Sequence, residues 1–346
     1  MPNTTKHRIF VMALARLAQV IPVIMEKQLL TYKSTRQFSD LVLDYLEGSD
    51  QLRPFFNRAP DLDQVKAQIQ EKSQSFPPSS RAKLVQALIG QYQDFSVNES
   101  FDQRIKLAIQ ALSGEKTFTV TTGHQLNLFT GPLYFLHKIV STINFTKELK
   151  DTYPDYNFVP IYWMASEDHD FDEINYFNFR GKKIQWNRED GGAVGRFNTD
   201  GLEAVLNIIS AEFGEGRYAK QLKSWFKDAY INHDNLADAT RYLANALFAE
   251  YGLVIIDADD RELKRLFIPQ MQKELLEQTS YTTVKETNSE IETLGLNIQV
   301  NPREINLFYL DENLRERIVF EGDIFKVKNT DLERKQLDFL LIEEGY

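Results

Sequence analysis

One segment in the middle of the chain constrains the fold more than any other. Residues 117–122 are a short β-branched run, which predicts a strand, and residues 123–131 form a polar loop. Pro132 stands where the first residue of a helix belongs, and the helical pattern runs to about Lys150. Residues 158–165 are apolar without alternation, which predicts a second strand buried on both faces. Strand, loop, helix and strand make a βαβ unit, so the two strands are expected to be parallel.

Helical patterns lie on both sides of this unit, and a third buried strand ends in Asp257. We therefore predict an α/β fold with a Rossmann-like parallel-sheet core, a helical N-terminal region and mixed insertions. A short hairpin is expected around Arg180 and Gly181. The expected helices are 35–46 (closed by Gly48), 62–70, 80–92, 101–112, 202–213, 218–230, 236–251, one after Asp260, and 331–342 with Asn329 or Thr330 as its cap; short strands are expected at 305–310, 316–320 and 324–327.

The length of 346 residues suggests about two domains. Changes between helical and strand-like sequence patterns divide the chain further. The predicted parts are an N-terminal extension (1–29), a helical part (30–116), the first half of the core (117–176), an inserted connecting domain (177–251) and the second half of the core with additional helices and short strands (252–346).

The charge balance excludes some classes of partner. Fifty acids against forty bases give a formal net charge of −10, which argues against nucleic acid and against anionic membrane surfaces as partners. The chain has no cysteine, so it has no thiol nucleophile, no thiolate metal site and no disulfide, which is compatible with a cytoplasmic location.

The N-terminus carries the only pattern that resembles a targeting segment. A basic stretch, residues 6–8, precedes an apolar run from Ile9 to Met25, but Arg16 and Gln19 interrupt the run. We favour an N-terminal helix, or an extension upstream of a start at Met25, over a signal peptide. No segment reaches about 18 uninterrupted apolar residues, so no transmembrane helix is expected.

The loop after the first predicted strand is the first candidate site. Thr122, Gly123 and His124 follow the strand and lead to a helix start, whose free N–H groups favour phosphate or carboxylate. Gly123 permits close backbone approach, and His124 and Gln125 offer hydrogen bonds to phosphoryl oxygens. The pattern Thr-x-Gly-His resembles the nucleotide-binding signature of nucleotidylyl-transferases and class I aminoacyl-tRNA synthetases. A glycine turn with a packed histidine is the alternative.

An acidic run after the second predicted strand is the second candidate site. Five of the seven residues from 167 to 173 are acidic, with His169 among them and no Lys or Arg. Because parallel strands end at one edge of the sheet, we expect this run beside the first loop. The run could hold an ammonium group and sugar hydroxyls, which we favour, could bind a divalent cation, or could be a solvated loop. Trp163 before it and Phe171 within it make full solvation less favourable.

Together these stretches resemble the bacillithiol biosynthesis cysteine-adding enzyme family. The resemblance rests on residues 122–134, 160–175 and 301–310, with a further match at 38–58, and extends from about Leu30 to Tyr346. It implies a Rossmann-like core with inserted connecting domains and a cytoplasmic ligase that joins cysteine to the amino group of glucosaminyl-malate. It also implies a homodimer formed through a C-terminal coiled coil, which we expect to be missing from this chain.

The resemblance also implies residue roles. We expect catalytic roles for His124, Asp168 and His169 and no protein-bound metal; the metal requirement stays open. ATP or ADP is the expected cofactor, with activation through an adenylate or an acyl phosphate left open. The place of His124 is often Gln in relatives, which favours hydrogen bonding over proton transfer. The expected substrate- or nucleotide-binding residues are Thr122, Gly123, Gln125, Asn127, Thr130, Gly131, Tyr134, Lys138, Trp163, Glu167, Asp170, Asp172 and Arg303.

Two other functions remain open from the residues alone. One is a non-catalytic sugar- or nucleotide-binding partner of another enzyme. The other is a metal-dependent hydrolase that uses the acidic run.

Overall fold

The computed structural model describes residues 30–189, 191–321, 324–327 and 330–332. The chain divides into two compact units: one runs up to Asn57 and includes Leu294–Leu296, and the other contains the remaining residues. The expected N-terminal helix and the Met25 start lie outside the described residues. None of the described helices combines the length and apolar character that crossing a bilayer needs.

The smaller unit is helical. It contains α2 (Tyr32–Thr35), α3 (Asp40–Glu47) and the 3-10 helix η1 (Asp50–Phe55). The single helix expected from residue 35 is wrong at its start, because Arg36 adopts a left-handed conformation (φ 55°) that ends α2. Ser39 then caps α3 by accepting a hydrogen bond from the Val42 N–H, and Gly48 ends it as expected.

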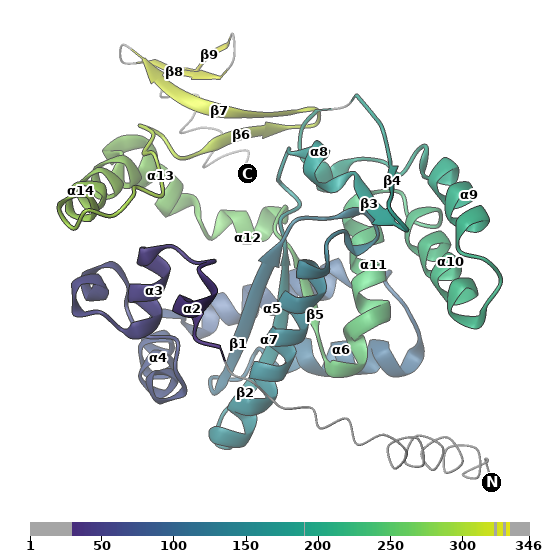
Figure 1. The fold of residues 1–346 in the computed structure, drawn as a ribbon, viewed down its shortest axis with the longest axis horizontal. Helices are drawn as coiled ribbons and strands as arrows, with labels where there is room; N and C mark the ends of the chain where they lie inside the picture. The colour runs from purple at the N-terminus through teal and green to yellow at the C-terminus, as the bar shows by residue number, and fades with distance from the viewer. Residues whose placement is uncertain (1–29, 190, 322–323, 328–329, 333–346) are drawn as a thin grey trace. The chain divides into compact units, whose positions relative to one another are not determined.

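The larger unit is built on a parallel sheet of three strands in the order β1-β2-β5, labelled in Figure 1. These are β1 (Thr117–His124), β2 (Asn157–Met164) and β5 (Val254–Asp257). Helix α7 (Leu133–Thr152) connects β1 to β2, so the predicted βαβ unit is confirmed. β1 runs two residues further than expected, through Gly123 and His124.

Helices cover both faces of this sheet. Tyr162 and Met164 pack in one apolar cluster with Phe135 of α7, and this cluster also contains residues of α11 (Leu236–Phe248). Val159 and Ile161 point the other way, into a cluster with α5 (Pro78–Gln91) and α6 (Glu99–Ala111). Burial on both faces explains the absence of alternation in β2. Helix α4 (Leu62–Ser75) adds a smaller cluster through Ile69, against Phe118 of β1.

The region between β2 and β5 is mixed, as expected. The hairpin β3 (Tyr176–Phe179) and β4 (Lys182–Gln185) turns at Arg180 and Gly181, both at positive φ (49° and 76°). The rest is helical: α8 (Phe171–Ile174), η3 (Val194–Arg196), α9 (Leu202–Glu212), α10 (Arg217–Tyr230) and η4 (Ala249–Tyr251), in addition to α11.

A second, antiparallel sheet follows the parallel one. After α12 (Arg261–Arg265), α13 (Ile268–Glu277) and α14 (Thr279–Thr293), the chain forms β6 (Phe308–Asp311), β7 (Leu314–Glu321), β8 (Ile324–Val327) and β9 (Thr330–Leu332). A separate apolar cluster joins Ile318 of β7 to Leu275 of α13. The helix expected from residue 331 is wrong in its first two residues, which pair in β9, and its remainder lies outside the described residues.

Candidate functional site

The two motifs predicted from sequence meet at the carboxyl edge of the parallel sheet. The strand register places His124, Met164 and Asp257 beside one another at the ends of β1, β2 and β5. The N–H of Ala165 continues the ladder past the strand end by donating to the carbonyl of His124 at 3.0 Å. This arrangement confirms the expectation that the loop after β1 and the acidic run after β2 are neighbours.

Gln125 joins the loop to the acidic run. Its Nε2 donates to Oδ2 of Asp168 at 2.9 Å and to Oε2 of Glu173 at 3.0 Å. The buried hydroxyl of Tyr162 lies 3.3 Å from the carbonyl oxygens of both His124 and Gln125, and this contact holds the backbone of these two residues in place. The amide of Gln125 is therefore held between two carboxylates, and the two motifs form one site.

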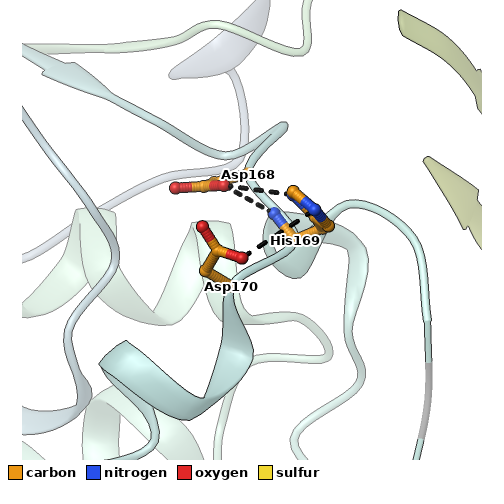
Figure 2. Close-up of side chains that lie close together, drawn as sticks. All are labelled: Asp168, His169 and Asp170. Carbon is orange, nitrogen blue, oxygen red and sulfur yellow. Dashed lines mark hydrogen bonds and ion pairs between the residues drawn. The ribbon is translucent and has the colours of Figure 1, made fainter. Parts of the chain in front are cut away.

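The centre of the acidic run is a compact cluster of Asp168, His169 and Asp170, shown in Figure 2. Oδ1 of Asp168 accepts a hydrogen bond from the backbone N–H of His169 at 2.8 Å and lies 3.5 Å from its Nδ1. Nε2 of the same ring lies 3.8 Å from Oδ1 of Asp170. The two carboxylates lie on the same side of the imidazole, as Figure 2 shows, so they present negative charge to one small volume.

The environment keeps Asp168 ionised. Partial burial alone would raise the pKa of its carboxyl, but the hydrogen bonds from Gln125 and from the His169 N–H, together with the Arg315 charge, lower the pKa below its ordinary value. A second loop supports the same segment, because the N–H groups of Val194 and Gly195 donate to the carbonyls of Asp168 and Ser166, each at 2.8 Å.

Arg315, on β7, is the residue of this site that sequence analysis missed. Its Nη1 lies 2.6 Å from Nδ1 of His169, and its guanidinium stacks on Phe308 with its central carbon 3.8 Å from the ring centroid. Because a guanidinium only donates, Nδ1 of His169 accepts, and the neutral ring carries its proton on Nε2. The charged pattern Leu314-Arg-Glu-Arg317 gave no signal for a site, since Arg315 lies far along the chain from His169.

His124 lies against α7 rather than in the acidic cluster. Its ring centroid is 5.4 Å from that of Phe135 and 6.0 Å from that of Tyr134, and its Nδ1 lies 3.2 Å from the Gln125 carbonyl. Burial lowers the pKa of this imidazole below its ordinary value, so the ring is neutral near pH 7. No described polar contact joins it to Asp168 or His169.

The loop before α7 is held in an unusual backbone conformation. Phe129, Thr130 and Gly131 have positive φ values of 50°, 69° and 52°. The N–H of Phe129 is fixed by a 2.8 Å hydrogen bond to the buried hydroxyl of Tyr230. The hydroxyl of Thr130 does not cap α7, because Pro132 is the N-cap of this helix and no side chain caps this end.

Other predicted residues take separate positions. Lys138 donates to the carbonyl of Gly123, and its ammonium lies 5.3 Å from the ring centroid of Tyr134. Asn127 is buried, with its Oδ1 lacking a hydrogen-bond partner among the described residues. Asp172 accepts a weak bond from Asn175 at 3.4 Å, and Arg303 is exposed ahead of β6 without a described contact to the cluster.

A cavity of about 490 Å³ opens beside the acidic cluster. Trp163 lines it from β2, and Ala258 from the turn directly after β5. Lys264 and Phe267 line it from the helical segment that follows, and Phe308 and Arg315 from the antiparallel sheet. Glu167 also lines it and pairs with Lys264 at 2.8 Å. The volume lies within the range of small-molecule pockets.

The acidic cluster only partly suits a metal ion. Asp168, His169 and Asp170 each offer one ligand atom, and these atoms lie within 4.8 Å of one another. The Arg315 guanidinium bound to His169 places a positive charge directly beside this volume, which opposes a divalent cation.

Comparison with known proteins adds a family and several relatives. Residues 25–344 match the sequence model of the family described as "Bacillithiol biosynthesis BshC, N-terminal Rossmann-like domain". A Flavobacterium johnsoniae protein named "Putative cysteine ligase BshC" is 56% identical over 301 residues, which are 87% of this chain and 56% of that protein. Proteins with the same name from Flavobacterium psychrophilum (50% identical; 91% of this chain, 59% of that protein) and Salinibacter ruber (28%; 88% and 56%) also match. The chain thus spans a little over half the length of these relatives.

Proposed function

Since the chain belongs to the BshC family of bacillithiol biosynthesis, we propose that it is a ligase that joins cysteine to the amino group of glucosaminyl-malate. The observation that carries this proposal is the double hydrogen bond of Gln125, which unites the loop after β1 and the acidic run in one site. The relatives' name supports cysteine as one substrate; the second substrate, the amide bond and the use of ATP belong to the proposal.

The acidic cluster is suited to an amine. Asp168 is ionised and Asp170 lies beside the same imidazole, so the pair attracts an ammonium group. Only the neutral amine has a lone pair for the acyl carbon, so the bound ammonium first loses one proton to solvent water. When the nitrogen bonds to the acyl carbon, its remaining N–H protons become far more acidic. A carboxylate of this cluster can then take the second proton. His169 offers an N–H rather than a lone pair, because Arg315 occupies its Nδ1.

The loop after β1 is suited to an anion. Forming an amide from a free carboxylate is uphill in water, so the cysteine carboxyl must be activated, and ATP would supply that activation as an adenylate or an acyl phosphate. In this chain, the uncapped N–H groups at the start of α7 and the ammonium of Lys138 would hold the phosphate or carboxylate. The C–N bond then forms as the activating group leaves with the former carboxyl oxygen.

Mass spectrometry of the products tests this proposal. Purified protein is incubated with glucosaminyl-malate, cysteine and ATP, with omission of each component as a control. The expected product has the summed mass of the two substrates less one water. The full-length F. johnsoniae relative serves as the comparison, because this chain corresponds to 56% of that protein. If neither protein forms the product, the proposed reaction is wrong for this family.

A further inference from the structure

We propose that the 490 Å³ cavity beside the acidic cluster binds the sugar ring and a carboxylate of the amine-bearing substrate, with Trp163 under the ring and Arg315 on the carboxylate. This inference rests on the proposed function, whose amine it places at Asp168 and Asp170. It assigns a binding role to Arg315, Phe267 and Phe308, which no sequence pattern indicated.

The walls of the cavity expose aromatic surface that a ligand would cover. Trp163 is 44% exposed at the end of β2, and Phe267 is 53% exposed between α12 and α13. The other strand residues of β2 are largely buried, so the exposed indole is the exception on this strand. A pyranose ring has apolar C–H faces that cover such a side chain and hydroxyls at its edge that need polar partners. Gln270 and Asn306 supply amides at the cavity wall.

The positive charges of Lys264 and Arg315, which both line the cavity, differ in how far carboxylates neutralise them. Lys264 lies 2.8 Å from Oε1 of Glu167 and 2.5 Å from Oδ1 of Asp259, so its charge is already paired. Arg315 instead donates to a neutral imidazole and stacks on Phe308. Within the described part of the chain, no carboxylate lies within ion-pair distance of Arg315, although its charge acts on Asp168 from further away. Its guanidinium has further N–H groups, which suit a bidentate carboxylate.

The position of Arg315 connects the cavity with the acidic cluster. The same guanidinium lines the cavity and bonds to His169, and the carboxylates of Asp168 and Asp170 lie on the same side of the His169 ring. Glucosaminyl-malate carries its amine and its malate on neighbouring carbons of the sugar ring, so it would place its amine on the cluster and a malate carboxylate on the adjacent Arg315. These opposite charges on neighbouring carbons fix the orientation of the ring.

Binding measurements on the complete chain test this site without needing turnover. The probes are glucosaminyl-malate, glucosamine, malate and ATP, followed by isothermal titration and by tryptophan fluorescence, with Trp163→Phe identifying the Trp163 signal. Glucosaminyl-malate should change that signal. Arg315→Met should weaken its affinity about 10- to 100-fold, the effect of losing a hydrogen bond to a charged group, while the affinity for glucosamine, which has no carboxylate, does not fall.

Arg317→Met is the matched control, because Arg317 lies two residues along β7, 5.5 Å from the same Phe308 ring centroid. It should bind as the wild type does. Equal affinity of the Arg315→Met and wild-type proteins for glucosaminyl-malate, or a Trp163 response to ATP alone, would overturn the site. If the probe binds as expected but neither this chain nor the full-length F. johnsoniae relative forms a cysteine adduct with ATP, the proposed reaction fails and the binding site stands.

Discussion

Nη1 of Arg315 and Nδ1 of His169 lie 2.6 Å apart, and this contact links the antiparallel sheet to the carboxyl edge of the parallel sheet. The segment that carries Arg315 is held in place by close packing of its turn. A Cβ on Gly192 would lie 3.0 Å from the backbone carbonyl carbon of Asn313, so the loop after β4 and the turn between β6 and β7 fit closely together. The site is thus built from three separate stretches of sequence.

The first prediction concerns the tautomer of His169. In the wild type, Nδ1 should be unprotonated, because it accepts from Arg315. In Arg315→Met, Nδ1 should gain a proton and donate to Asp168, whose Oδ1 lies 3.5 Å away. Long-range ¹H–¹⁵N correlation spectra of the imidazole measure this change. Arg317→Met should leave the wild-type pattern, and identical spectra for both variants would contradict the prediction.

A second prediction concerns Gln125, whose amide separates two carboxylates. Gln125→Glu should destabilise the protein by about 1–2 kcal/mol, because two hydrogen bonds to Asp168 and Glu173 are replaced by repulsion between like charges. Lowering the pH should reduce this loss, since protonation of a carboxyl removes the repulsion. Urea unfolding at two pH values measures both effects. A loss that is the same at both pH values would show that repulsion is not its cause.

A third prediction concerns how the ion pairs of Asp259 make the stability of the protein depend on pH. Burial alone would raise its pKa, but Arg196 (at 2.5 and 2.9 Å) and Lys264 (at 2.5 Å) lower the pKa below its ordinary value of 3.8. A carboxyl whose pKa is lower in the folded state stabilises the fold above its unfolded pKa, and this stability is lost as the pH falls through the folded value. Asp259→Asn should cost about 2 kcal/mol at pH 7 and progressively less below about pH 4. Calorimetry across this pH range measures the stability difference between the wild type and Asp259→Asn, which should shrink as the pH falls. A difference that is the same at every pH would contradict the prediction.

Sequence patterns predicted the part of the site that is formed by consecutive strands and the loops that follow them. The β-branched run before His124 and the apolar run before Ser166 specify strands, and their βαβ connection brings both loops to one edge. Arg315 could not be found this way, because its position depends on how a second sheet packs. The break at Arg36 was also missed, since an arginine at positive φ has no local sequence signal. Short strands were expected at 305–310, 316–320 and 324–327, but the sequence pattern did not predict that they form a sheet separate from the parallel one.

The backbone around Gly131, and not that around Gly123, requires a residue without a Cβ. A Cβ on Gly123 would meet nothing closer than the Trp163 carbonyl oxygen at 3.8 Å, whereas one on Gly131 (φ 52°) would lie 2.5 Å from Cβ of Asn127. Gly131→Ala should therefore destabilise by about 2–3 kcal/mol. Gly90→Ala, inside α5 with open space around it, should instead stabilise by about 0.5–1 kcal/mol. Thermal unfolding compares the two, and a Gly131→Ala protein as stable as the wild type would show that the loop can relax.

The last prediction separates the charge of Asp168 from its structural role. Asp168→Asn keeps the shape of the side chain but removes its charge and leaves a single acceptor oxygen for two donors, Gln125 Nε2 and the His169 N–H. The free energy of unfolding should fall by only about 1 kcal/mol, because the site is partly solvated. The affinity for an amine-bearing substrate should fall about 10-fold or more, because one of the two carboxylates that attract the ammonium is gone. Asp155→Asn, exposed just before the opposite end of β2, is the control and should change neither quantity. Titration with glucosaminyl-malate decides the matter: if Asp168→Asn binds as tightly as Asp155→Asn, the acidic cluster does not hold the amine.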